Sequence, residues 1–152
     1  MFRSGRMFKK ILVPVDGSEL AKKALDYAEM LAKTFDAEII LFQVVHPLFT
    51  YRSPEAVAPF LMMDFNQKEL AEKYLASLAE ELRKRDSKVT TKLKIGYQVA
   101  MEIIKFTKES GVDLTVLSTH GRSGISRWVL GSVAHKVLFG AETPILLIYM
   151  KK

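Results

Sequence analysis

The chain has 152 residues, of which 49% are hydrophobic and 26% charged, and its formal net charge is +6. This length predicts a single domain with a hydrophobic core of its own. Because the sequence contains no cysteine, disulfides, thiolate metal sites and cysteine nucleophiles are excluded. No apolar stretch approaches the roughly 20 residues that span a bilayer, and the apolar run 11–15 is too short for a signal peptide. We therefore expect a cytoplasmic protein that does not enter a membrane.

The positive charge raises the question of nucleic-acid binding, because basic proteins gain affinity by displacing counterions from phosphates. The distribution of charge argues against it. Basic and acidic residues are interleaved along the expected helices, as at Lys68-Glu69 and Glu72-Lys73. Such patterns are typical of solvated helix faces that carry ion pairs. We expect no nucleic-acid partner.

The first expected elements are a strand over residues 10–15 and a helix that opens at Ser18. A serine followed by an acidic residue is typical of a helix N-terminus. A second strand is expected over 37–45. Met7 is a second plausible start, so we expect residues 1–6 to be a flexible extension and residues 7–152 to form one domain. The apolar face of the first helix is expected to contain Leu20, Ala24, Ala28, Leu31 and Phe35.

Residues 46–65 interrupt the pattern, because they combine three prolines with several large apolar residues. We predict a long apolar loop that folds over the sheet edge; a lid or a protein-contact surface is the alternative. Asn66, with Glu69 three residues later, resembles a capping box and predicts that the second helix begins there. Its buried face is expected to contain Leu70, Ala71, Tyr74, Leu78 and Leu82.

The rest of the chain continues the alternation of strand and helix. Alternation of this kind predicts right-handed crossovers and an open parallel sheet with helices on both faces, a Rossmann-like α/β architecture. The remaining elements are expected, in chain order, as a strand over 88–95, a helix from about Ala100 to Ser110 that Gly111 ends, a strand over 113–118, a helix over 132–140 and a strand over 144–150.

Small and hydroxyl-bearing residues follow the fourth strand at 118–124, and Gly131-Ser132 opens the last helix. Glycines let several backbone N–H groups point at one spot, and a helix N-terminus adds the positive end of its dipole. For five strands in the order 3-2-1-4-5, the end of the fourth strand faces Asp16, where ligands bind in such sheets. The sequence therefore predicts a nucleotide phosphate site. Taken singly, Asp16 and Ser132 can also be helix caps, and the glycines plain turns.

Other signatures of catalysis are missing from the sequence. It contains neither the phosphate loop G-x-x-x-x-G-K-[ST] nor the dinucleotide signature G-x-G-x-x-G, and 121–124 is one residue short of a G-x-S-x-G nucleophile elbow. His46, His120 and His135 are not spaced as metal ligands. We therefore expect no catalytic residue and no metal held by protein side chains.

Three segments resemble one known family. Residues 11–18, ILVPVDGS, resemble the opening of universal stress proteins, and residues 119–124, THGRSG, with 130–134, LGSVA, resemble that family's ATP-binding loop. The closing residues 143–148, TPILLI, look like its last strand. The resemblance covers residues 7–152. It implies the adenine nucleotide alpha hydrolase-like fold with strand order 3-2-1-4-5, usually as a homodimer, in a family with ATP-binding and non-binding branches.

The binding branch is marked by Gly, two residues, Gly, nine residues, Gly and then Ser or Thr. Gly121, Gly131 and Ser132 occupy the last three of these positions, whereas Ser118 stands where the first glycine is expected. The resemblance implies that Asp16 contacts the nucleoside and that the Val44 backbone meets adenine. The whole expected site comprises Pro14, Val15, Asp16, Val44, Ser118, His120, Gly121, Arg122, Gly124, Gly131, Ser132 and Val133.

The function implied is that of an ATP-binding, nucleotide-responsive regulatory or protective protein with little or no hydrolysis. ATP is expected to carry Mg²⁺ or Mn²⁺ on its phosphates. A homodimer is expected through the last strand, Ile145 to Met150, together with an unidentified downstream protein. Two alternatives stay open. One is a dimeric interaction protein without nucleotide, which Ser118 favours, and the other is an ATP-using enzyme such as a ligase of a related α/β class.

Overall fold

The computed structural model describes residues 7–47, 57–120 and 130–149, with the backbone alone for residues 57–65. Five strands form one parallel sheet in the order β3-β2-β1-β4-β5, as the sequence predicts. Each strand lies within two residues of its expected bounds. The strands are β1 (Lys10–Pro14), β2 (Glu38–Val45), β3 (Lys88–Ile95), β4 (Leu114–Ser118) and β5 (Ile145–Ile148).

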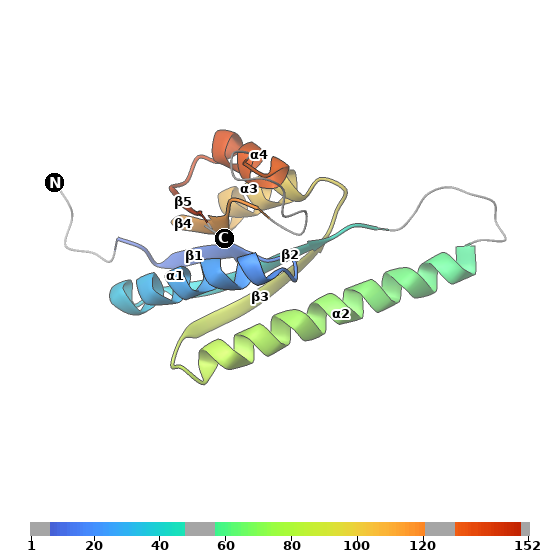
Figure 1. Ribbon diagram of the computed structural model, residues 1–152, viewed down its shortest axis with the longest axis horizontal. Helices are drawn as coiled ribbons and strands as arrows, with labels where there is room; N and C mark the ends of the chain where they lie inside the picture. Colours follow the sequence, from blue (N-terminus) through green and yellow to red (C-terminus); the bar gives the residue numbers. More distant parts are fainter. Residues whose placement is uncertain (1–6, 48–56, 121–129, 150–152) are drawn as a thin grey trace.

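Helices cover both faces of the sheet (Figure 1). The described ranges contain the helices α1 (Glu19–Phe35), α2 (Val57–Arg83), α3 (Val99–Ser110) and α4 (Ser132–Gly140). Alternate residues of a strand point to opposite faces. Ile11 and Val13 of β1 therefore pack under α1 and α2, while Leu12 between them packs under α3 and α4. Burial on both faces explains why these strands read as continuous apolar runs.

The helix ends follow from local chemistry. The Ser18 hydroxyl accepts a hydrogen bond from the Ala21 backbone N–H at 3.2 Å and so caps α1 as expected. Gly111 ends α3 in the left-handed conformation, with φ of +63°, which glycine adopts without strain. Asp36 takes the same conformation after α1, with φ of +54°. Gly131 occupies the N-cap position of α4, and it has no side chain that could accept a hydrogen bond from the first N–H groups of that helix.

Two expectations about α2 are wrong. The helix begins at Val57, not at Asn66, so much of the segment expected as a loop is helical. Pro59 is compatible with this start, because the first N–H groups of a helix have no intrahelical partner and proline lacks only that group. Leu70, expected to be buried, is 66% exposed. The buried face of α2 runs through Ala71, Leu75, Leu78 and Leu82, and Leu70 lies on the flank of that face, at the wall of a cleft.

A buried carboxylate joins α1 to the turn between α2 and β3. Glu29 is only 6% exposed. It accepts hydrogen bonds from Arg85 Nη1 at 2.8 Å and from the Ser87 hydroxyl at 3.1 Å, and Lys33 Nζ lies 3.0 Å away. The charge is therefore paired and its oxygens are occupied, which is the condition under which a buried carboxylate is tolerated.

The exposed side of α2 carries ion pairs one turn apart. Lys73 Nζ lies 2.6 Å from Glu69 Oε1, and Lys84 Nζ lies 2.9 Å from Glu80 Oε1. The lysine hydrogen bonds lower the pKa of both glutamates. All four side chains are more than half exposed, so the pairs contribute little to stability. The interleaved charges of the sequence are thus solvated helix pairs, as expected.

Candidate functional site

A cleft with a volume of about 780 Å³ opens at the carboxyl ends of the strands. It lies at the point where the strand order reverses, between β1 and β4, and extends over the end of β2. Such crevices are the usual ligand sites of open α/β sheets. The described lining residues are Pro14, Val15, Asp16, Gly17, Ala21, Gln43, Val44, Val45, His46, Gln67, Leu70, Ala71, Tyr74, Val99, Leu117, Ser118, Thr119, Gly131, Ser132, Val133 and Ala134.

The end of β1 supplies a carboxylate to the cleft. Asp16 follows the strand directly, and its Oδ1 accepts a hydrogen bond from the Ser18 backbone N–H at 2.9 Å. Gly17 between them has φ of +84°, which bends the chain away from the strand into α1. A carboxylate has about four lone-pair sites, so Asp16 can accept from Ser18 and from a ligand hydroxyl at the same time.

The start of α4 is held against the end of β4. The Gly131 backbone N–H donates to the Thr119 carbonyl at 2.8 Å. A Cβ atom on residue 131 would lie only 2.9 Å from that carbonyl oxygen, so this approach requires glycine. The backbone N–H groups of Ser132 and Val133 follow in the first turn of α4, where N–H groups lack intrahelical acceptors and the helix dipole is positive.

The loop after β4 is tied together by its own hydroxyl groups. The Ser118 hydroxyl donates to the His120 carbonyl at 2.8 Å. The Thr119 hydroxyl lies 3.1 Å from His120 Nδ1. His120 Nε2 is buried and has no hydrogen-bond partner within the described part of the chain. His120 itself does not line the cleft.

The end of β2 presents open backbone to the cleft. The Val15 N–H donates to the Phe42 carbonyl at 2.8 Å, which is the last such bond from β1 to β2. Alternate residues of a parallel strand face the same neighbour. The N–H and C=O of Val44 therefore point to the side where β1 has already turned away at Asp16.

The structure brings most of the expected site residues to one place. Apart from His120, all the expected residues that it describes line this cleft. Gly121, Arg122 and Gly124 lie outside the described residues. The lining also contains residues that the sequence did not single out as site residues. The part of the cleft beside α2 adds Gln43, Gln67, Leu70, Ala71 and Tyr74.

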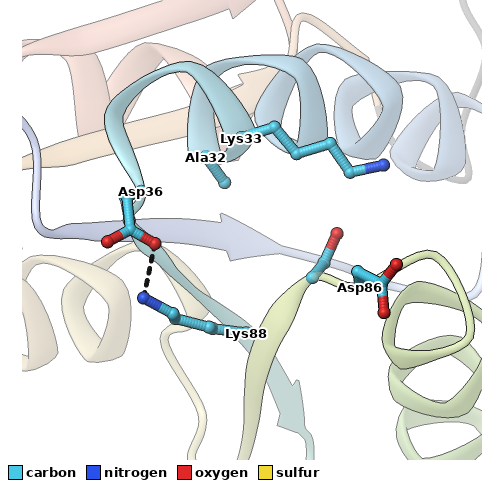
Figure 2. Close-up of a pocket in the computed structure, with 7 residues that line it drawn as sticks. Ala32, Lys33, Asp36, Asp86 and Lys88 are labelled. Atoms are coloured by element: carbon cyan, nitrogen blue, oxygen red, sulfur yellow. Dashed lines mark hydrogen bonds and ion pairs between the residues drawn. The ribbon is translucent and has the colours of Figure 1, made fainter.

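A smaller cavity of about 150 Å³ lies at the opposite end of the sheet (Figure 2). Lys33, Asp36 and Lys88 line it together with Asp86. Figure 2 shows the Lys88 ammonium facing Asp36, with Nζ 2.5 Å from Oδ1. Lys33 is paired with Glu29. Because Lys33 and Lys88 are already paired with carboxylates, the larger cleft is the better candidate for a ligand site.

Two further findings bear on function. Among residues 7–47, 57–120 and 130–149, no group of three or more histidine, aspartate or glutamate side chains is placed to hold a metal ion. Across the same ranges, no helix has the length and apolar content that a membrane span requires.

The fold and the cleft together define a class: a doubly wound parallel α/β domain with a ligand-sized crevice at its switch point. Within that class the chain belongs to the universal stress protein family, whose family model matches residues 7–148. It is 30% identical to universal stress protein MJ0531 of Methanocaldococcus jannaschii, over 100% of this chain and 89% of that protein. It is 33% identical to universal stress protein YxiE of Bacillus subtilis, over 93% and 99% of the two chains.

Solved structures agree with this assignment. The protein MJ0577 superposes with a TM-score of 0.81 at 28% identity, over 96% of this chain and 99% of that chain. More distant members share the fold and were solved with nucleotides. One from Archaeoglobus fulgidus, in complex with dAMP, has a TM-score of 0.67 at 22% identity, over 93% of this chain and 98% of that chain. One from Arabidopsis thaliana, with AMP bound, has a TM-score of 0.64 at 21% identity, over 94% and 92%.

Proposed function

We propose that the cleft binds ATP, with Mg²⁺ or Mn²⁺ on the phosphates, and that the chain is a nucleotide-responsive regulatory or protective protein. One observation carries the proposal: a carboxylate, an open strand edge and an uncapped helix N-terminus meet in a single cleft, at Asp16, Val44 and Gly131–Val133. These groups match the ribose, the base and the phosphates of a nucleotide. The nucleotides bound to the Archaeoglobus and Arabidopsis family members support the same assignment.

The phosphates are assigned to the start of α4. Free N–H groups and the positive dipole end attract anions there, and glycine lets the ligand approach the backbone. Gly131, Ser132 and Val133 line this part of the cleft. Since the described residues offer no acidic cluster for a metal, the cation is assigned to phosphate oxygens. Ser118, Gly121, Arg122 and Gly124 complete the expected phosphate and ribose contacts.

The nucleoside is assigned to the ends of β1 and β2. Asp16 accepts from ribose hydroxyls, and the Val44 backbone offers one donor and one acceptor to the edge of adenine. Pro14 and Val15 form the adjoining wall. Adenine carries a ring acceptor beside an amino donor, which is the complement of a peptide N–H and C=O.

We expect little or no ATP hydrolysis. Among the described residues that line the cleft, Asp16 is the one carboxylate, and its Oδ1 already accepts from the Ser18 N–H. Hydrolysis needs a residue that orients water in line with the leaving phosphate. We assign Asp16 to the nucleoside and no residue to that role.

A homodimer through β5 belongs to the same proposal. Both β3 and β5 are edge strands. β3 carries Lys88, Lys92 and Lys94, the kind of charge that protects an edge from pairing. β5 has the sequence ILLI and no charge, so pairing with a twofold-related copy protects it.

The proposal is tested by asking what the purified protein binds. Heat denaturation without added nucleotide, followed by chromatography of the released small molecules, is expected to yield adenine nucleotide. Adding ATP and Mg²⁺ at 100 times the Kd is expected to stabilise the fold by about 2.7 kcal/mol. For a chain of this size that corresponds to a rise in Tm of roughly 5–10 °C. An empty protein whose Tm does not respond to ATP contradicts the proposal and favours the interaction protein without nucleotide.

A further inference from the structure

One side chain in the cleft is unlike its neighbours. Gln43 lies on β2 opposite Leu93 of β3. On its other side is Val15, because Pro14 is the register partner of Phe42. Val15 belongs to the apolar core under α1 and α2, and Leu93 packs against it. Gln43 is therefore an amide within an apolar row of the sheet.

This amide is buried and incompletely bonded. Gln43 is 6% exposed. Its Oε1 is buried and has no hydrogen-bond partner among the residues that the structure describes. A leucine at this position would continue the apolar row, whereas an unpartnered buried acceptor lowers stability. The amide therefore destabilises the fold relative to a leucine, and its presence points to a role other than packing.

The position of Gln43 places that role in the cleft. Gln43 lines the cleft and directly precedes Val44, whose backbone is open at the same edge. Rotation about the last side-chain bond exchanges the oxygen and nitrogen of an amide within the same space. Neither end of the amide makes a hydrogen bond with the residues that the structure describes, so this rotation breaks none of theirs.

We propose that Gln43 determines base specificity: its carboxamide oxygen accepts a hydrogen bond from the exocyclic amino group of the purine. The inference rests on the proposed nucleotide binding and adds to it. An exocyclic amino group has two N–H donors. One is met by the Val44 carbonyl at the strand edge, and the other by Gln43 from the α1 and α2 side of the sheet. The cleft then selects a purine with an amino group at position 6.

The test is a cycle of two proteins and two ligands. The proteins are the wild type and Gln43→Leu, and the ligands are ATP and purine riboside triphosphate, the analogue that lacks the 6-amino group. Calorimetry or fluorescence titration gives four Kd values. The preference for ATP is the Kd of purine riboside triphosphate divided by the Kd of ATP. We expect this ratio to be about threefold to tenfold larger for the wild type than for Gln43→Leu, which corresponds to the free energy of one net hydrogen bond.

Thr115→Val is the matched control. Thr115 is fully buried in β4, its hydroxyl has no partner among the described residues, and it does not line the cleft. Removing its hydroxyl is expected to leave the preference for ATP unchanged. Gln43→Met, unbranched and of similar length, is the second variant, used if Gln43→Leu perturbs the sheet.

The outcomes separate the inference from the proposed function. If the wild type binds ATP and both Gln43 variants keep the full preference for the 6-amino group, Gln43 does not read the base and the inference is wrong. If the wild type binds neither ligand, the proposed function fails and the inference fails with it. A preference that falls in the Gln43 variants and not in Thr115→Val supports the inference.

Discussion

Gly131→Ala tests the start of α4 with a single added methyl group. The new Cβ would lie 2.9 Å from the Thr119 carbonyl oxygen and 3.6 Å from the His120 Cα. Ordinary carbon–oxygen contacts are about 3.3–3.6 Å. The obstacle is backbone, so α4 must move away from β4 by about half an ångström. The same oxygen accepts the Gly131 N–H bond of 2.8 Å, which the movement lengthens.

The expected cost follows from these contacts. Overpacking costs about 1–3 kcal/mol, and a weakened hydrogen bond adds up to about 1 kcal/mol. We therefore expect Gly131→Ala to lose about 1–4 kcal/mol of stability, or roughly 2–16 °C in Tm. Nucleotide affinity is expected to fall at least about tenfold, because the N–H groups of Ser132 and Val133 move with the helix. Urea denaturation measures the first quantity and titration with ATP the second.

Gly111→Ala is the matched control for this experiment. Gly111 has φ of +63°, where an alanine is strained, yet its Cβ would meet no atom within 4 Å. It lies before β4, at the end of the sheet opposite the cleft. We expect a loss of about 1–2 kcal/mol with unchanged ATP affinity. If Gly131→Ala is destabilised and still binds ATP with the wild-type Kd, the start of α4 does not hold the phosphates.

Three further variants test other parts of the structure. Asp16→Asn keeps the shape of the side chain and removes its charge, so ATP affinity measured by titration is expected to fall about tenfold; an unchanged Kd removes Asp16 from the site. Glu29→Ala removes the buried acceptor of Arg85 and Ser87 and is expected to cost about 1–3 kcal/mol in urea denaturation with unchanged ATP affinity; stability within about 0.5 kcal/mol of wild type contradicts this role. Leu147→Pro removes an outward N–H of β5, because Pro144 and Ile148 face β4, where their carbonyls accept from the Thr115 and Thr119 N–H groups, and Leu147 alternates with them. Light scattering is expected to give twice 17.2 kDa for wild type and 17.2 kDa for this variant, and equal masses contradict a β5 interface.

The fold could be predicted because its signals are local. Ser18 caps α1 and Gly111 ends α3 through contacts within a few residues, and both are visible in the sequence. The predicted start of α2 was wrong because, in the sequence, a proline in the first turn of a helix cannot be told from a proline in a loop. Glu29 was missed because its partners Arg85 and Ser87 are 56 and 58 residues away in the chain. No pattern in a single sequence shows that they meet.

The same distinction applies to the candidate site. Asp16 and Gly131 stand at recognisable transitions from strand to helix, so their place at the cleft could be predicted from strand order. Gln43 and Leu70 became cleft residues only through the placement of α2. Leu70 has the spacing of a core residue, but it lies on the flank of the buried face beside Ala71 and forms part of a cleft wall.

Ser118 is the one departure from the binding motif of the family, and the structure shows what its hydroxyl does. The hydroxyl donates to the His120 carbonyl two residues later, so its proton is already used within the loop. The Gly131 N–H ties the neighbouring Thr119 carbonyl to the start of α4. Ser118 thus contributes to fixing the backbone segment on which α4 rests. A side chain that orders this segment reduces the ordering that a nucleotide must impose on binding. The departure is therefore compatible with the proposed nucleotide site.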